Sequence, residues 1–528
     1  MSTTFADALC IALKQRAVDY IFGMPGGASL PMLEAMRRHG ITFVLCRHEG
    51  SAGFMADGVA QRTGGLGVCI ATLGPGVTNL VSGVAGAYLE RSRVLAITAQ
   101  IEPHIQGIYT HQILNQQALF QSICKEYITI HPKSVHPQLL QLFRKLEHGE
   151  AAPVVLEIPS SSAKAPCLSI RKEISPTIVP QPVMQLVSYV QKAKHPIIFV
   201  GCAQMDEEFC AVLTKFAEHF QIPVLTTYRA KGVLSEYHPL SMGACGLSPK
   251  VDSILLAWMQ KSDLVLTLGL DAVELRPNWL EAWIVPTISI SPSSCANDLT
   301  IPLLLDIRSS ATSHLQFCLE HHSNPKESWC DTSQYVKENL AALFVDEPHG
   351  PASMVAAIQR GAPQNTVLSL DVGAHRITAS HVWKCTRPRN VLQSNGFSSM
   401  GVGVPMAIAV KLQEPDTCSI ALCGDMGFAM SLGELGVVQD HDLHLIVIYF
   451  RDNSLKLIAL KQQRAGFPES GMNFCNPEPT ALANAFGGQA RITHTCLELE
   501  QAVQEASQSH GLWLIEATID PQSYNQQL

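Results

Sequence analysis

The sequence has few charged residues and no surplus of positive charge. Only 16% of its 528 residues are charged, and 37 basic against 45 acidic residues give a formal net charge of −8. Proteins that bind nucleic acid through its phosphates need a basic surface, so this balance argues against a nucleic-acid partner. No run reaches the roughly 18 uncharged apolar residues of a membrane span, and the N-terminus lacks the pattern of a signal peptide. We therefore expect a soluble, cytoplasmic protein with a small-molecule ligand and no membrane contact.

Cysteine pairs and repeats are also missing. The 16 cysteines occur singly, without a C-x-x-C pair, and several stand inside apolar runs, where a reduced thiol acts as a small hydrophobic side chain. Low-complexity segments and short-period repeats are absent. At 47% hydrophobic residues the chain is too apolar to be disordered, and it is too long for one core. We expect three domains.

Short apolar runs of the kind that form buried strands alternate with stretches of helical spacing. They fall into three successive groups: 41–46, 66–72 and 94–99; 195–201, 222–227 and 262–269; and 366–371, 418–425 and 443–450. The pattern predicts three consecutive α/β domains, each with an open parallel sheet. A proline-containing stretch and a polar stretch are the best linkers, which predicts domains at 1–175, 176–345 and 346–528.

The stretch SIALCGDMGF (419–428) places one carboxylate, Asp425, at the end of an apolar strand and beside two glycines. In open parallel sheets, ligands bind at the carboxyl ends of strands, and a tight glycine turn lets the backbone approach them. The following FAMSLGELGVV is predicted to be a helix, whose N-terminus would favour an anion. Alternatively, Asp425 is simply the N-cap of that helix. The next strand ends in RDNS, which adds a second carboxylate, Asp452, and two carboxylates with a bound phosphate suit Mg²⁺.

GDMGF followed by RDNS resembles the Gly-Asp-Gly to Asn-Asn signature of thiamine-diphosphate enzymes. Met426 departs from that pattern, and so does the Arg451-Asp452 pair. The resemblance implies that Asp425, Asp452 and the main-chain carbonyl of Ser454 bind the Mg²⁺ that holds the cofactor's diphosphate.

A second stretch, RHEGSAGFMADGVAQRTGG, resembles the acetohydroxyacid synthase and pyruvate oxidase branch of these enzymes. The resemblance implies that Glu49 hydrogen-bonds the aminopyrimidine ring and so helps to remove the proton from the cofactor's reactive carbon. Read without that resemblance, Glu49 is a helix-start carboxylate favoured by the helix dipole.

Glycine-rich loops in FGMPGGASLP, TLGPGVTNL and GFSSMGVGVPMAI, together with DVGAH, agree with the same branch. The resemblance implies that Met400 is the apolar wedge that bends the cofactor, although a methionine in such a loop can also be a core residue. The other cofactor contacts that it implies are Gly27, Pro75, Asn79, Ala374, His375, Ser398, Met426, Gly427 and Ile458. In THQILNQQ, His111 and Gln112 align with an aromatic-Gln pair near the reactive carbon, where they could move protons or bind a carboxylate; otherwise they are exposed loop residues.

The resemblance implies decarboxylation of a 2-oxo acid, with transfer of the acyl group to a second carbonyl compound as in acetolactate synthase. The alternatives are a simple 2-oxo acid decarboxylase, a flavin-coupled oxidase and a non-catalytic scaffold. Asp271 stands where the synthases have an arginine that receives the second substrate's carboxylate and helps to seat FAD, and Lys461 replaces a tryptophan of their acceptor pocket. Both departures argue against true acetohydroxyacid synthase activity and against FAD binding. Because Glu49 and Asp425 are in different domains and family active sites form between chains, we expect a homodimer or homotetramer.

Overall fold

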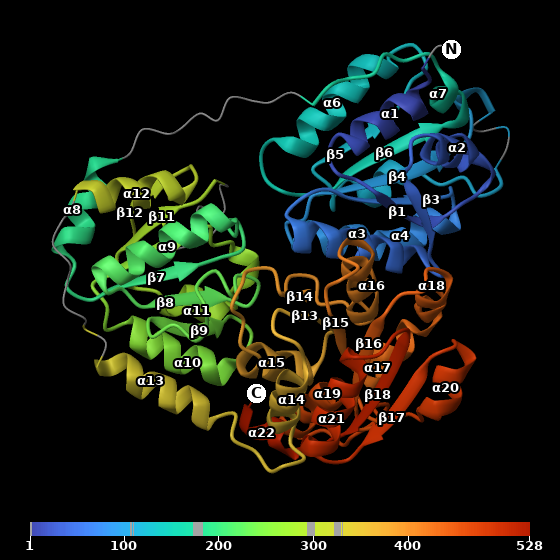
Figure 1. Ribbon diagram of the computed structural model, residues 1–528. Coiled ribbons are helices and arrows are strands. Elements are labelled where there is room, and N and C mark those ends of the chain that lie inside the picture. The colour runs from blue at the N-terminus through green and yellow to red at the C-terminus, as the bar shows by residue number, and fades with distance from the viewer. Residues whose placement is uncertain are drawn as a thin grey trace.

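The computed structural model describes residues 3–105, 108, 110–172, 183–292, 301–321, 329 and 331–527. It contains three six-stranded sheets in which all strand pairs are parallel, each flanked by helices (Figure 1), so the predicted fold class is confirmed. Among the described residues no helix is long and apolar enough to cross a membrane.

The first sheet has the strand order β2-β1-β3-β4-β6-β5. Its strands are β1 (Tyr20–Met24), β2 (Thr42–Leu45), β3 (Gly67–Ala71), β4 (Val94–Gln100), β5 (Glu126–Thr129) and β6 (Val154–Pro159). Its helices are α1 (Phe5–Lys14), α2 (Leu30–Arg38), α3 (Glu49–Thr63), α4 (Pro75–Leu89), α5 (Gln116–Phe120), α6 (Val135–Glu147) and α7 (Ser160–Lys164).

The central sheet has the order β12-β11-β10-β7-β8-β9. Its strands are β7 (Pro196–Val200), β8 (Val224–Thr227), β9 (Ser241–Cys245), β10 (Leu264–Leu268), β11 (Thr287–Ile290) and β12 (Leu303–Ile307). The helices around it are α8 (Met184–Lys192), α9 (Glu207–Phe220), α10 (Pro249–Met259), α11 (Pro277–Ala282), α12 (Ala311–His321) and α13 (Asp331–Ala342). The strand order reverses between β7 and β10, which makes a crevice at their carboxyl ends.

The third sheet has the order β14-β13-β15-β16-β18-β17. Its strands are β13 (Val367–Leu370), β14 (Val391–Gln393), β15 (Ser419–Gly424), β16 (Leu445–Arg451), β17 (Gln489–Thr493) and β18 (Leu512–Thr518). Its helices are α14 (Pro351–Gly361), α15 (Ala374–Val382), α16 (Gly403–Gln413), α17 (Asp425–Met430), α18 (Leu435–Asp440), α19 (Lys456–Arg464), α20 (Pro479–Ala485), α21 (Cys496–Ser507) and α22 (Tyr524–Gln527).

The helix predicted after Asp425 is not continuous, which corrects the sequence-based expectation. It is divided into α17, a 3₁₀ turn at Leu432–Glu434, and α18. The division occurs at Ser431, whose hydroxyl donates to the carbonyl oxygens of Gly427 and Phe428 and so competes with the helical hydrogen bonds. The predicted boundary at 345/346 lies between α13 and α14, and the one at 175/176 lies outside the described residues.

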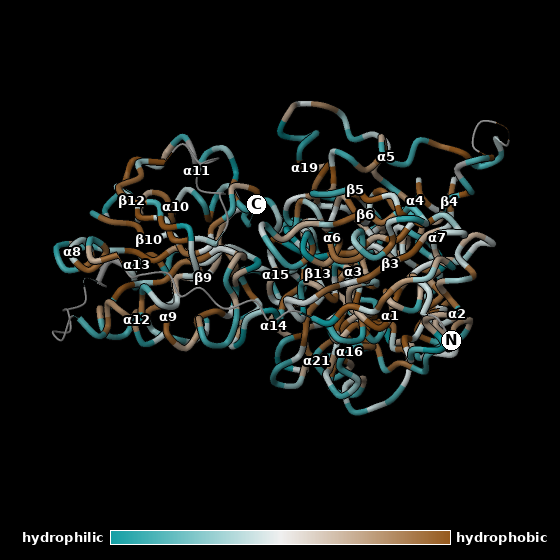
Figure 2. Tube along the Cα trace, turned by 90° about the horizontal axis from the view of Figure 1, so that it is seen from above, coloured by the Kyte–Doolittle hydropathy of each residue, from teal (hydrophilic) through white to brown (hydrophobic). Residues whose placement is uncertain are grey.

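The first and third domains pack together through α3 and α16, which lie side by side between their sheets (Figure 1). Both helices are buried along nearly their whole length, because they are rich in glycine, alanine and other apolar residues on every side. The apolar residues follow the strands through the middle of each domain, and the central domain lies to one side of the other two (Figure 2).

Candidate active site

A cavity of about 260 Å³ lies at the carboxyl edge of the third sheet. It is bounded by the loops that follow β13, β15 and β16, the loop before α16, and the start of α19. Ten of the predicted site residues line it: Ala374, His375, Ser398, Met400, Asp425, Met426, Gly427, Asp452, Ser454 and Ile458. The fold therefore brings these ten residues together from four separate segments of the third domain.

Asp425 is the first residue of α17, and Gly424 is its N-cap. One carboxylate oxygen accepts hydrogen bonds from the Asn453 backbone N–H (2.8 Å) and from Nδ2 of Asn476 (2.9 Å). The other accepts from the backbone N–H of Met426 at 3.0 Å. These contacts fix the carboxylate, and they tie it to the neighbouring strand end as well as to its own helix, so a capping role does not account for it.

Asp452 follows β16, and its carboxylate accepts from the Ser454 backbone N–H at 3.0 Å. Burial, together with the nearby charge of Asp425, raises the pKa of Asp452 to about 7. Burial also raises the pKa of Asp425. Two partly buried carboxylates that repel each other at the ends of adjacent strands are a fitting place for a divalent cation. The hydroxyl of Ser454 lies beside them and has no hydrogen-bond partner among the described atoms.

His375 lies in the first turn of α15, where that helix begins at the cavity. Its side chain is buried, and Nε2 has no hydrogen-bond partner within the described structure. Burial, with the neighbouring Arg376 guanidinium, lowers the pKa of His375 to about 3, so the ring is neutral at pH 7. An unpartnered ring nitrogen together with free N–H groups at a helix start is suited to a phosphate oxygen.

Ser398 and Met400 stand on the loop between β14 and α16, which buried polar groups hold in place. Ser398 has φ +54°, and its hydroxyl donates to the carbonyl oxygen of Asn395 at 2.9 Å. Next to Met400, the backbone N–H of Gly401 donates to both carboxylate oxygens of Asp371, at 3.0 and 3.1 Å. The loop is therefore anchored from the end of β13 and carries Met400 into the cavity wall.

Glu49 is positioned by the first domain. It is the first residue of α3, its side chain is 5% exposed, and its Oε2 accepts from Nδ2 of Asn79 at 3.0 Å. A Cβ at Gly76 would stand 3.1 Å from the other carboxylate oxygen, so a larger residue there would crowd this carboxylate. Glu49 and Asn79 thus form one preorganised pair, with Asn79 exposed at the surface.

Of the other predicted residues of the first domain, Gln112 and His111 belong to a loop beside the start of α4, whereas Gly27 lies elsewhere. Gln112 packs against the turn before Pro75, because a Cβ at Gly74 (φ +69°) would come within 2.7 Å of the Gln112 Cβ. His111 is exposed in the same loop. Gly27 lies on the wall of a different cavity, in front of α2, and a Cβ there would meet no atom within 4 Å.

Within the described part of the chain, no residue of the first domain lines the cavity that holds Asp425. Apart from Gly27, the structure therefore separates the predicted residues into two groups within one chain, one around Glu49 and one around Asp425. Of the residues that depart from the family pattern, Asp271 forms an ion pair with Arg91 (2.7 Å), and Lys461 is exposed on α19.

Two residues with a clear role in this geometry were not predicted from the sequence. Asp371 anchors the Met400 loop. The sequence does contain a signal for Asp371, because it is a carboxylate directly after a strand, as Asp425 is. Asn476 orients Asp425 from a segment 51 residues farther along the chain, and nothing in the local sequence around it indicates that contact.

Three family models match the chain in order. They are the thiamine pyrophosphate enzyme N-terminal TPP binding domain at residues 3–119, the central domain at 183–313 and the C-terminal TPP binding domain at 371–517. The chain is 29% identical to a probable acetolactate synthase large subunit of Methanococcus aeolicus, over 98% of this chain and 92% of that protein. It is 28% identical to the corresponding protein of Methanocaldococcus jannaschii, with the same coverage, and 25% identical to an acetolactate synthase of Bacillus subtilis, over 98% and 93%. The chain belongs to the thiamine pyrophosphate enzyme family.

Proposed function

We propose that this protein decarboxylates a 2-oxo acid and transfers the acyl group to a second carbonyl compound, in the manner of an acetolactate synthase. Relatives named acetolactate synthase match nearly the whole chain, which supports this reaction class. The structural observation that carries the proposal is the single cavity in which Asp425, Asp452, His375 and Met400 meet.

The residues present fit Mg²⁺ and thiamine diphosphate. Asp425, Asp452 and the Ser454 carbonyl would hold the cation, which would remove the repulsion between the two carboxylates. His375 and the N–H groups at the start of α15 would hold the diphosphate. When bound, thiamine diphosphate supplies a carbon nucleophile for the carbonyl of the 2-oxo acid and a place for the electron pair that CO₂ leaves behind.

Glu49 is the proposed proton-handling group. Its burial and its hydrogen bond from Asn79 hold one carboxylate oxygen in place, which leaves the other for a ring nitrogen of the aminopyrimidine. Met400 and Ile458 would exclude water from the reacting carbon, and Gln112 and His111, near the turn before Pro75, would meet the substrate.

We further propose that a functional site needs two chains, in a homodimer or a homotetramer. Glu49 does not reach the cavity of its own chain, whereas the exposed face of α4 beside it presents Pro75 and Asn79 to the outside. A second copy can bring that face to the cavity, and a two-fold axis makes both sites equal. FAD is not part of the proposal, because Asp271 is already engaged by Arg91.

Product analysis tests the reaction. The purified protein is incubated with thiamine diphosphate, Mg²⁺ and a panel of 2-oxo acids beginning with pyruvate, while CO₂ is measured and the carbon products are identified by mass spectrometry. A 2-hydroxy-2-methyl-3-oxo acid from pyruvate is the expected product. Aldehyde alone would instead identify a simple decarboxylase, and no CO₂ from any acid would refute both.

Two variants test the residues and the pairing of chains. Glu49→Gln should lose turnover but keep cofactor binding, and Asp425→Ala should lose cofactor binding. When the two variants are co-expressed, mixed dimers have one site with both wild-type residues, so activity should return to about a quarter of the wild-type rate. No recovery from verified mixed dimers would mean that Glu49 acts within its own chain or not at all.

A further inference from the structure

The start of α19 forms part of the wall of the proposed active-site cavity. The cavity is lined there by four consecutive residues, Leu455, Lys456, Leu457 and Ile458. Leu455 is the N-cap of this helix, and it offers no side-chain acceptor to the first N–H groups. The positive end of the helix dipole therefore lies at the cavity without a counter-charge from the cap.

Lys456 adds a full positive charge at the same place. It is the first residue of α19, and among the described residues it is the only lysine or arginine on the cavity wall. Its ammonium has no hydrogen bond and no ion pair within the part of the chain that the structure describes. A cation at the positive end of a helix is unfavourable, and no ion pair offsets it here. An anionic ligand in the cavity would balance both charges.

Lys456 lies near the end of the cavity that holds the two carboxylates. Burial and the charge of Asp425 raise the pKa of Asp452, whereas the Lys456 ammonium acts on that pKa in the opposite direction, which requires the ammonium to be close to Asp452. Mg²⁺ would neutralise the two carboxylates. The negative charge of a diphosphate would then be left to Lys456 and to neutral hydrogen-bond donors.

Tyr524 contributes a neutral donor to the same cavity. It is the first residue of α22, its side chain is 2% exposed, and its hydroxyl has no hydrogen-bond partner among the residues that the structure describes. Burial, and then the charge of Asp452, raises the pKa of Tyr524 well above its usual value, so the hydroxyl keeps its proton and can donate. Gln527 fixes α22, because its side chain accepts from Thr378 (2.7 Å) and donates to Asp346 (3.0 Å).

We propose that Lys456 and Tyr524 bind the diphosphate of the cofactor, in addition to His375 and the start of α15. Lys456 would pair with a phosphate oxygen as a charged donor, and Tyr524 would donate a neutral hydrogen bond. Neither residue was among those predicted from the sequence. Two further polar groups of this wall lack partners within the described chain, Nε2 of His375 and the hydroxyl of Ser454, and both suit an oxyanion. This role of Lys456 rests on the proposed function, because it requires thiamine diphosphate in this cavity.

Titration with thiamine diphosphate at saturating Mg²⁺, followed by quenching of intrinsic fluorescence, tests the assignment without a reaction. Lys456→Gln should weaken binding by at least about tenfold, since a charge-assisted hydrogen bond is lost, and Lys456→Arg should stay within about threefold of the wild type. Tyr524→Phe should weaken binding by about fivefold, because it removes only a neutral hydrogen bond. Inorganic pyrophosphate, which carries the diphosphate alone, should compete less well in Lys456→Gln by the same factor as the cofactor loses.

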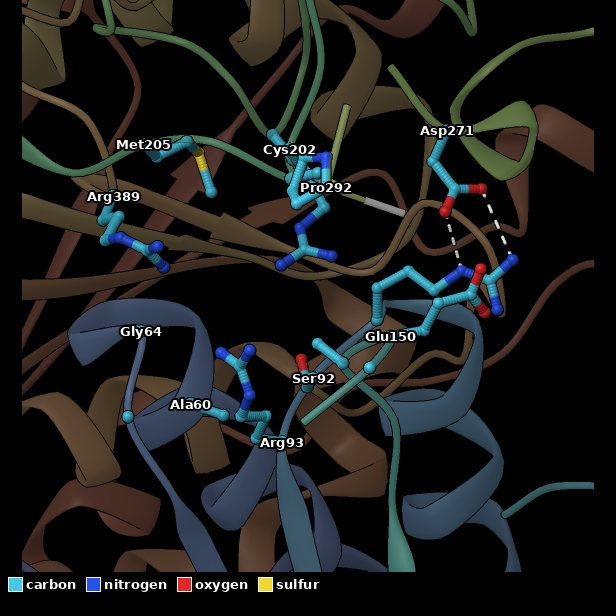
Figure 3. A pocket seen from close by; sticks show the side chains of 16 residues that line it. Ala60, Gly64, Ser92, Arg93, Glu150, Cys202, Met205, Asp271, Pro292 and Arg389 are labelled. Carbon is cyan, nitrogen blue, oxygen red and sulfur yellow. Dashed lines mark hydrogen bonds and ion pairs between the residues drawn. The ribbon is translucent and has the colours of Figure 1, made fainter. Parts of the chain in front are cut away.

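Two control variants remove a positive charge elsewhere. Lys461→Gln does so on the exposed part of α19, outside the cavity, and Arg93→Gln does so in a separate cavity where the three domains meet (Figure 3). Both should bind thiamine diphosphate as the wild type does. Without the cofactor, the thermal midpoint of Lys456→Gln should equal that of the wild type, because Lys456 has no partner in the described chain to lose.

The affinities distinguish this assignment from the proposed function. If the wild type binds thiamine diphosphate and Lys456→Gln binds it equally well, Lys456 is not a diphosphate ligand, while the proposed function stands. If Lys456→Gln keeps its affinity for the cofactor and for pyrophosphate but needs more 2-oxo acid for half-maximal CO₂ release, Lys456 contacts the substrate instead, which also overturns the assignment. An equal loss in either control would reduce the effect to general charge and overturn it too. A wild-type protein that does not bind thiamine diphosphate would refute both.

Discussion

Replacing Glu90 with alanine should weaken the junction of all three domains. Glu90 closes the C-terminal end of α4, and its side chain is 1% exposed. One carboxylate oxygen accepts from the Ser394 hydroxyl (3.0 Å) and from the backbone N–H groups of Gly396 (2.8 Å) and Phe397 (3.3 Å). The other lies 3.5 Å from Nη1 of Arg229, in the central domain.

The magnitude follows from what the substitution leaves behind. Arg229 is buried and would lose its carboxylate partner, and breaking such a pair from one side costs about 3–5 kcal/mol. The two N–H groups and the hydroxyl would also be left without an acceptor, at about 1–3 kcal/mol for each group that water cannot reach. Because these losses overlap, we expect the free energy of unfolding to fall by about 4 kcal/mol.

The same substitution should reduce cofactor affinity, because residues 394–397 lead directly into the loop of Ser398 and Met400. Urea unfolding measures the stability, and quenching of intrinsic fluorescence measures the binding of thiamine diphosphate. The control is Glu34→Ala, an exposed partner of Arg37, which should change stability by less than about 1 kcal/mol. A Glu90→Ala variant as stable as this control would refute the view that Glu90 holds the three domains together.

Two other predictions follow from the site and from the buried carboxyl groups. Asn476→Ala should weaken Mg²⁺ binding in the presence of thiamine diphosphate by about tenfold, because Asp425 loses a hydrogen-bond donor that orients it. Titration with Mg²⁺ measures this affinity, and the control is Asn484→Ala on the exposed side of α20. Burial, and then the charge of Glu90, raises the pKa of Asp57 from 3.8 to about 6. The folded state therefore favours the protonated acid, so stability falls as pH rises from about 4 to 6 and is constant above. The free energy of unfolding of Asp57→Asn should therefore exceed that of the wild type by an amount that grows to about 3 kcal/mol between pH 4 and pH 6 and stays at that value at pH 8. Urea unfolding at each pH measures this difference. A difference that does not change with pH would contradict this assignment.

The strands could be predicted from the sequence because each is a short apolar run bounded by turn residues. Each of the nine predicted runs overlaps a strand of the structure, and their grouping gives the three sheets. The single helix expected after Asp425 was wrong, because helical spacing did not reveal that the Ser431 hydroxyl would bond back to two carbonyl oxygens.

The candidate site could be predicted in part for the same local reason. Asp425 and Met400 stand in glycine-containing loops after strands, Asp452 directly follows a strand, and in a parallel sheet all these strand ends lie at one edge. Asn476 could not be found in this way, because its contact with Asp425 spans 51 residues without a shared motif.

The sequence by itself determined the chain's class, its three sheets and the loops that carry the thiamine pyrophosphate motifs, because these depend on periodicity and on residues close together in the chain. Only the tertiary structure decided that Glu49 lies outside its own chain's cavity and that Glu90 joins three domains. These relations depend on how separate domains pack, and residues 306 positions apart, such as Glu90 and Gly396, leave no joint pattern in a single sequence.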